Sequence, residues 1–338
     1  MKAHALRIGK AMSAALFVLL LVVVGAKNAL AQTQVATLQH GEDISVYYGA
    51  NAFVEAHEAA QTGDIITLSS GTFTPTDITK AITLRGAGCA IDTVTDTQPT
   101  IFSNSINLNV TDTENFLTVE GIKFANYMNF GTLNNPQFNR CNFFSIGVSY
   151  SFSSPTMNNA QFVNCIIKTF YFNYVTNPIF INCVVWYPSS SQSGSTPLYY
   201  NSILQTPSSA FSAINSIVCG NNLPSSVSSC TNCIGIYQYG NMFVNCNATG
   251  CITYSSYEEV FESFTGGSSL SFEESFALKD EIATGFLGTD GTQVGIYGGT
   301  IPYSSRPFYM APARYNVSNK SNNEGKLNVG IEIITEGE

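Results

Sequence analysis

The chain has 338 residues, of which 44% are hydrophobic and only 11% are charged, and its formal net charge is −9. Ordinary globular domains carry about 25% charged residues, so polar uncharged and aromatic side chains stand here where charge is usual. This composition excludes charge-rich disorder and coiled coil, and the acidic balance argues against nucleic acid as a partner.

Residues 1–31 predict a secretory signal peptide. The first ten residues carry three basic side chains, an unbroken apolar run extends over Ala14–Val24, and Ala29-Leu30-Ala31 supplies a small-x-small cleavage site. As a helix this run spans only about 16 Å, too short for a membrane anchor. We therefore expect an exported protein, secreted, periplasmic or held at the cell surface, with no transmembrane segment in the mature chain.

A short helix is predicted next, followed by strands. Ala52, Phe53, Ala56 and Ala60 recur on one helical face. Gly63-Asp64 ends this helix, and a strand is expected over 65–68. The strands that follow are short, rich in β-branched and aromatic residues, and separated by Gly, Asn, Ser and Pro turns.

A weak four-residue motif recurs along the middle of the chain. Its copies are Phe138-Asn139-Arg140-Cys141, Phe162-Val163-Asn164-Cys165, Phe180-Ile181-Asn182-Cys183, Ala213-Ile214-Asn215-Ser216 and Phe243-Val244-Asn245-Cys246. A repeat near twenty residues built from short strands is typical of a solenoid whose units bury their apolar faces by stacking. A leucine-rich repeat fold is disfavoured because its characteristic leucine pattern is absent. A β-sandwich is disfavoured because its strands would not repeat one motif at the same position. The sequence predicts an all-β fold, a parallel β-helix.

Each motif position has an expected role in such a coil. Asn suits a corner because it tolerates left-handed backbone, and stacked Asn amides are expected to bond one another along the solenoid. Phe and Ile are expected to fill the core, with the small residue after Asn pointing inward. Cys141, Cys165 and Cys183 are accordingly predicted to be buried and unpaired.

Both ends of this region resemble one known group. Residues 53–73 with 82–88 resemble the opening of pectin-lyase-like right-handed parallel β-helices, in which a short helix caps the first rung. Residues 287–299 are similar to the closing segment of many exported bacterial proteins of that group, mostly of unassigned function. The resemblance implies a right-handed β-helix with an N-terminal cap over 32–300. It implies no single activity, because the group mixes lyases, hydrolases and adhesins.

The remaining residues, 301–338, predict a tail with one terminal strand. Leu327, Val329, Ile331 and Ile333 alternate with polar residues or glycine. This strand is expected to cap the open end of the solenoid rather than to begin a truncated sandwich module, since an isolated exposed strand promotes aggregation.

The distribution of ionisable residues argues against an enzyme in the middle of the solenoid. No Asp, Glu or His occurs between Glu120 and Glu258. Glycoside hydrolysis needs paired carboxylates, and pectate-type elimination needs acidic calcium ligands with a basic residue. We assign no catalytic residue and expect no cofactor or metal. The alternative is a polysaccharide lyase or glycoside hydrolase that uses carboxylates near one end of the solenoid, within 40–120 or 258–290.

Four cysteines near the end of the repeat region are close enough in sequence to bind a metal ion or to form disulfides. Cys230, Cys233, Cys246 and Cys251 have a spacing that could wrap zinc. The exported context favours disulfides among them over zinc, and free inward-facing thiols are the other possibility.

The aromatic residues carry the positive functional prediction. Of 40 aromatic residues after residue 31, 24 lie in 121–257, the stretch without carboxylates. Aromatic faces beside amides and hydroxyls suit neutral sugar rings. Five residues are predicted as glycan contacts: Tyr171, Trp186, Tyr187, Tyr199 and Tyr200. We therefore expect a non-catalytic β-helix for binding or surface display, with a polysaccharide or cell-surface glycan as partner.

Overall fold

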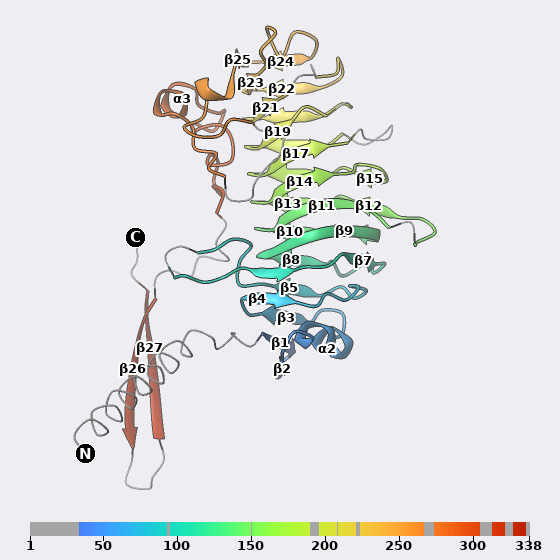
Figure 1. Cartoon of the computed structure of the whole chain (residues 1–338), viewed down its shortest axis with the longest axis vertical. Helices are drawn as coiled ribbons and strands as arrows, with labels where there is room; N and C mark the ends of the chain where they lie inside the picture. The colour runs from blue at the N-terminus through green and yellow to red at the C-terminus, as the bar shows by residue number, and fades with distance from the viewer. Residues whose placement is uncertain are drawn as a thin grey trace, which may run out of the picture.

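The chain folds as a right-handed parallel β-helix of about 10 turns (Figure 1). This computed structural model describes residues 34–335 except 93–94, 150, 190–195, 208, 221–223, 267–273, 305–312 and 322–326. The predicted signal peptide, 1–31, lies outside the described residues.

The N-terminal end is a mixed cap. Helix α2 (Ala52–Ala59) and strand β3 (Ile65–Leu68) confirm the predicted helix and first strand. Two further strands, β1 (Val35–His40) and β2 (Asp43–Tyr48), were not predicted, and β1 pairs antiparallel with both β2 and β3. The Lys80 ammonium closes the C-terminus of α2 by donating to the carbonyls of residues 57, 58 and 60 at 2.6, 2.9 and 2.7 Å.

Two long sheets then wind around one core. The first has 12 strands and runs β2-β1-β3, β5 (Thr83–Arg85), β8 (Thr118–Glu120), β10 (Gln137–Asn139), β13 (Gln161–Val163), β16 (Ile179–Ile181), β18 (Leu198–Tyr200), β20 (Ser212–Ile214), β22 (Ser229–Thr231) and β24 (Asn247–Thr249). The second has 13 strands: β4 (Gly71–Phe73), β6 (Thr100–Phe102), β7 (Ile106–Val110), β9 (Ile122–Asn134), β11 (Asn142–Val148), β12 (Thr156–Asn158), β14 (Ile166–Phe170), β15 (Val175–Thr176), β17 (Val184–Pro188), β19 (Ile203–Gln205), β21 (Ile217–Cys219), β23 (Ile234–Ile236) and β25 (Ile252–Tyr254).

The core is a column of identical positions on successive coils. Phe138, Phe162, Phe180 and Tyr199 are paired in register and fully buried. Their rings stack nearly parallel at centroid distances of 4.9, 5.0 and 4.8 Å. Ring contacts of this kind contribute about 0.5–1.5 kcal/mol each beyond burial, so the first motif position stabilises the stacking of coils.

The second column lies at the corner that follows the first sheet. The residue there has a left-handed backbone, with φ between 45° and 54° at Arg140, Asn164, Asn182, Asn201, Asn215 and Asn232. This confirms the predicted role of Asn. The phase of the last copy was wrong: Ala248 pairs with Cys230, so the final motif is 248–251, and Phe243–Cys246 lies in a turn.

The predicted Asn ladder exists, but at another corner. Asn159 Nδ2 donates to Asn135 Oδ1 at 3.1 Å, and Asn177 Nδ2 donates to Asn159 Oδ1 at 3.2 Å. These three residues also have positive φ. The motif asparagines bind a different part of the chain.

That part is the return segment, the described residues 257–266 and 274–303, which include η1 (Tyr257–Glu259) and α3 (Asp280–Gly285). The coil strands of the described chain end with β25, and this segment follows them. The segment runs back along the outside of the coils, as the orange trace in Figure 1 shows. Asn232, Asn215, Asn182 and Asn164 contact it in that order, through Leu287, Thr289, Ile296 with Gly298, and Pro302.

The C-terminal residues form a separate two-stranded sheet. Strand β27 (Leu327–Thr335) confirms the predicted terminal strand, and it pairs antiparallel with the unpredicted β26 (Ala313–Ser321). Among the described residues neither strand joins a solenoid sheet, so β27 does not extend the last coil.

Substitution of Asn182 tests how much the left-handed corner residue stabilises the fold. Its φ is 51°, and its Nδ2 donates to the carbonyls of Ile296 and Gly298 at 2.8 and 2.7 Å. Asn182→Ala should lower the free energy of unfolding by about 2–4 kcal/mol, from backbone strain and two unsatisfied carbonyls. Asn182→Gly relieves the strain and should cost about 1–2 kcal/mol, measured by urea unfolding. Equal losses for both variants would contradict a role for the left-handed backbone.

Candidate functional site

The return segment covers much of the outer face of the second sheet. Outward-facing residues of β14 to β23 form a second apolar core with it. The members from the coils are Ile166, Val184, Trp186, Ile203, Ile217, Cys219, Ile234 and Ile236, and those from the segment are Val260, Phe261, Phe264, Phe276, Leu278, Ile282, Val294 and Ile296. The part of this face that these residues form is therefore buried against protein.

Two predicted glycan contacts are consequently misplaced. Trp186 points out of the coil, but it packs edge-on against Phe264 at 5.2 Å and is 1% exposed. Tyr199 belongs to the inner ring stack, is 0% exposed, and has no hydrogen-bond partner for its hydroxyl. Burial also raises the pKa of Tyr199 well above its usual value. Neither side chain presents a face to a sugar.

The other three predicted contacts are accessible to different degrees. Tyr171 is 44% exposed, whereas Tyr187 and Tyr200 are half-buried. Tyr187 lies beside Trp186, with ring centroids 6.4 Å apart, at the margin of the covered face. Tyr200 lies on the first sheet, in register with Ile181 and Ile214. The structure thus does not bring the five residues into one site.

Tyr171 instead belongs to an exposed group on three successive coils, which we call the aromatic patch. The patch consists of Tyr127 and Asn129 of β9, Phe144 and Gly147 of β11, Lys168 of β14, and Tyr171 just after β14. The Tyr127 and Phe144 rings meet edge-to-face at 5.8 Å. Lys168 Nζ lies 5.4 Å from the Phe144 ring centroid, a cation–π contact.

Phe144 faces outward beside an inward-facing neighbour. Phe143 and Ser145 are buried, while Phe144 is 36% exposed and Tyr127 47% exposed. The register between β9 and β11 shifts here because two residues of β9, Ala125 and Asn126, lie opposite Phe144 alone, so the extra residue of the bulge belongs to β9. Neither aromatic residue was predicted as a contact from the sequence, because their local pattern does not show which exposed rings lie together.

Gly147 leaves a gap between two side chains of the patch. It is buried, and a side-chain carbon placed there would lie 3.5 Å from Tyr171 Cδ2 and 3.6 Å from Asn129 Oδ1. The tyrosine ring and the amide therefore lie close together, with no side chain between them. A ring face, an amide and an ammonium group on neighbouring coils offer stacking and hydrogen bonding without a carboxylate.

Cys230, Cys233, Cys246 and Cys251 are free thiols in the structure, which therefore shows none of the disulfides predicted among them. The predicted burial and lack of pairing of Cys141, Cys165 and Cys183 are confirmed. Burial raises the pKa of Cys141, Cys165 and Cys233, which keeps them as thiols at neutral pH.

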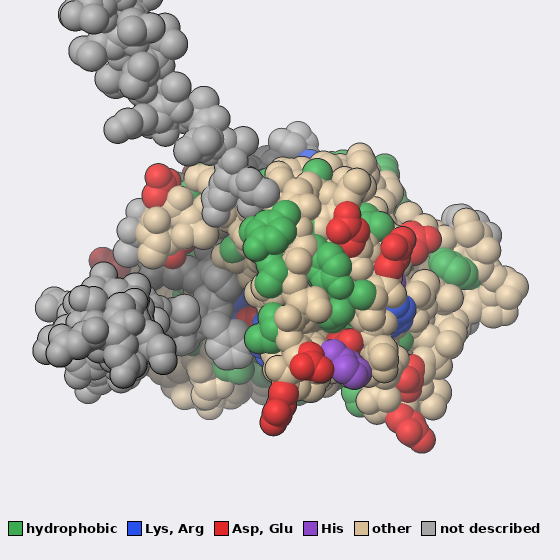
Figure 2. All heavy atoms as spheres, turned by 90° about the horizontal axis from the view of Figure 1, so that it is seen from below, with side chains coloured by type: hydrophobic (Ala, Val, Ile, Leu, Met, Phe, Trp, Pro, Cys, Tyr) green, Lys and Arg blue, Asp and Glu red, His purple; other side chains and the backbone are tan. Residues whose placement is uncertain are grey.

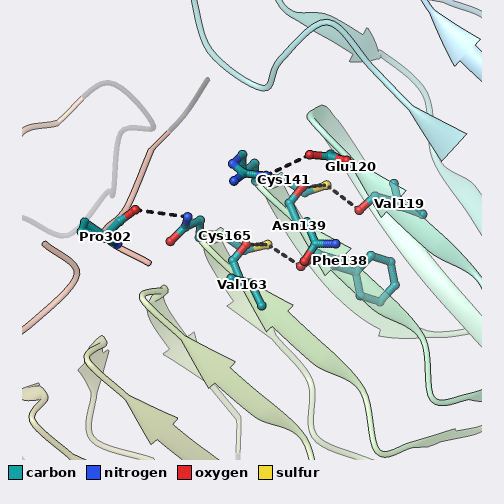
Figure 3. Close-up of polar contacts among 10 residues, drawn as sticks. Val119, Glu120, Phe138, Asn139, Cys141, Val163, Cys165 and Pro302 are labelled. Carbon is teal, nitrogen blue, oxygen red and sulfur yellow. Dashed lines mark hydrogen bonds and ion pairs between the residues drawn. The ribbon is translucent and has the colours of Figure 1, made fainter. Parts of the chain in front are cut away.

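Each thiol after a corner serves the backbone instead. Cys183 Sγ donates to the carbonyls of Ile181 and Phe162 at 3.2 and 3.3 Å and accepts from Cys165 N at 3.4 Å. Ser202 Oγ makes the same set of contacts one coil later, accepting from Cys183 N at 3.1 Å. Figure 3 shows the equivalent bonds of Cys141 to Val119 and of Cys165 to Phe138.

This equivalence predicts a clear difference between two substitutions. Cys183→Ser keeps a donor and acceptor at the γ position and should change the free energy of unfolding by less than about 1 kcal/mol. Cys183→Ala leaves the buried Cys165 N–H unsatisfied and should cost about 1–3 kcal/mol, measured by urea unfolding. A serine variant as unstable as the alanine variant would contradict this role.

The acidic residues of the early coils are engaged in separate local contacts. Asp64 pairs with His40 Nδ1 at 2.7 Å, and Glu120 pairs with Arg140 at 2.9 Å, as Figure 3 shows. Two backbone N–H groups that bond Asp112 lower the pKa of its carboxyl. None of these contacts joins two carboxylates. Within the described residues, no group of three or more His, Cys, Asp or Glu is arranged to hold a metal ion.

His57 is the buried titratable group of the N-terminal cap. It is 5% exposed in α2, and its Nε2 has no hydrogen-bond partner. Burial, followed by the charge of Lys80, lowers the pKa of His57 from 6.5 to about 4. The folded protein therefore holds this imidazole neutral where the unfolded chain would protonate it.

This shift predicts an acid-sensitive cap. Below pH 6.5 the unfolded state binds a proton that the folded state accepts only near pH 4, so stability falls as pH falls through this window. His57→Leu should flatten the dependence of the thermal midpoint on pH between 6.5 and 4, and leave the dependence above pH 7 unchanged. An unaltered slope in the variant would show that other groups cause the loss.

Comparisons with known proteins do not assign this chain to a family. No protein-family model matches the chain, and neither the curated proteins nor the solved structures searched contain a match. None of the helices in the described residues has the length and apolar character needed to span a bilayer.

Proposed function

We propose that this protein is an exported, non-catalytic β-helix that binds neutral glycan through the aromatic patch. The observation that carries the proposal is the exposure of Tyr127, Phe144 and Tyr171 on three successive coils, around the gap at Gly147. Exposed aromatic side chains gathered at one place mark interaction sites more often than scattered ones do. The proposal also takes the chain as a divergent member of the pectin-lyase-like group.

The chemistry of the patch favours sugar over other ligands. Tyrosine and phenylalanine faces stack on the C–H faces of pyranose rings, while Asn129 and the tyrosine hydroxyls can bond sugar hydroxyls. The segment from 121 to 257 holds no carboxylate or imidazole, so the patch lacks the paired carboxylates that glycoside hydrolysis uses. Binding without cleavage is the function that these residues support.

The test is affinity electrophoresis of the protein against a panel of neutral polysaccharides. Wild-type protein should be retarded by at least one gel. Tyr171→Ala and Gly147→Val should each weaken retention about tenfold, equivalent to ~1.4 kcal/mol. Gly147 has no positive φ, and a Cβ placed there lies at ordinary contact distances, so the backbone tolerates a side chain that would crowd Tyr171 and Asn129.

Tyr239→Ala is the matched control, because Tyr239 is 71% exposed and lies outside the patch. Absence of retention by every neutral polysaccharide would overturn the glycan proposal. Release of reducing ends or of unsaturated uronate from a polysaccharide would overturn its non-catalytic part.

A further inference from the structure

Strand β2 is an open edge at the N-terminal end of the first sheet. It is the last strand in the sheet order, and within the described residues it pairs with β1 alone. Natural edge strands are protected by lysine, proline or a bulge, and Asp43–Tyr48 contains no lysine or proline and pairs with β1 without a register shift. Such an edge can pair with another β-strand.

The side chains at this edge are apolar and exposed. Ile44, Val46 and Tyr48 are 66%, 45% and 67% exposed, and as alternate residues they share the outer face of the strand. Tyr47, on the other face, packs against the core. Figure 2 looks onto this end and shows hydrophobic side chains gathered there with acidic ones around them.

The backbone groups at the edge belong to the same three residues. Gly49 N donates to Gln34 O at 2.8 Å, in line with the β1–β2 register. Because hydrogen-bonded pairs alternate in an antiparallel ladder, residues 43, 45 and 47 bond β1. The N–H and C=O groups of Ile44, Val46 and Tyr48 therefore face the open side.

We propose that β2 pairs antiparallel with β2 of a second copy of this chain, across a two-fold axis at Val46. In this register Val46 faces Val46 of the other copy, and Ile44 faces its Tyr48. Every free N–H and C=O of the three residues then finds a partner, and both apolar rows lie on one face. Neighbouring registers would leave some of these groups unpaired, or would set apolar side chains against the opposite face.

Charge complementarity supports a second copy as the occupant. The same register sets Asp43 opposite Gly49 of the other copy, just before its α2. The N-terminus of α2 has no side-chain cap, since Asn51 makes no capping hydrogen bond. An acidic side chain beside uncapped helix N–H groups is favourable by about 0.3–1 kcal/mol. Two acidic residues lie here, Glu42 in the turn before β2 and Asp43 at its first position.

The two-fold register is tested by cysteine cross-linking. Paired residues at the axis have Cα atoms about 5.5 Å apart, within disulfide reach. With oxidised glutathione accepting the two electrons, Val46→Cys should give a covalent dimer on a non-reducing gel. Tyr48→Cys is the matched control: Tyr48 is on the same strand and more exposed than Val46, yet it lies about four residues, or ~13 Å, from its own copy, and should not cross-link.

Light scattering after size exclusion tests the association itself. Wild-type protein should have the mass of a dimer, at an ionic strength that screens the net charge of −9. Val46→Lys should halve that mass, whereas Val227→Lys, at another exposed apolar residue (71%), should not. A monomeric wild type, an unaffected Val46→Lys dimer, or faster cross-linking at position 48 than at 46 would each overturn the proposal.

Discussion

Hydrogen bonds at a single corner of each coil hold this solenoid together. A left-handed residue turns the chain, and the residue after it places a thiol or hydroxyl within reach of carbonyls on its own coil and on the preceding one. Buried backbone groups must be paired, and at a turn the sheets cannot pair them all. Cysteine and serine both occur at this position because both offer a small γ donor and acceptor.

The same corner also docks the last part of the chain. Asparagine adopts the left-handed backbone, and its amide then projects outward, where Asn182 and Asn215 bond the return segment. Asparagine therefore has two roles: its backbone turns the coil, and its side-chain amide binds the return segment. The outer apolar face of β14 to β23 is stable in water only because this segment covers it.

Covering that face leaves two surfaces that the fold does not use internally. The aromatic patch lies on β9 to β14, around Tyr127 and Tyr171, and consists of side chains. The β2 edge lies at the N-terminal end and consists mainly of backbone groups. They differ in what they can bind: the patch suits rings with hydroxyls, whereas the edge suits a strand. The two proposals are therefore independent of each other.

Much of the fold follows from local rules that a sequence carries. The helix at 52–59, the left-handed asparagines and the inward cysteines were predictable because each depends on spacing and intrinsic preference. Trp186 was predicted as an exposed contact, and it does point out of the coil. Exposure did not follow, because residues nearly eighty positions later fold back over that indole. Phe144 shows the converse, since it leaves β11 on the outer side beside buried Phe143 and remains exposed. Local chemistry determines which way a side chain leaves the strand, but only tertiary packing decides whether it meets water or protein.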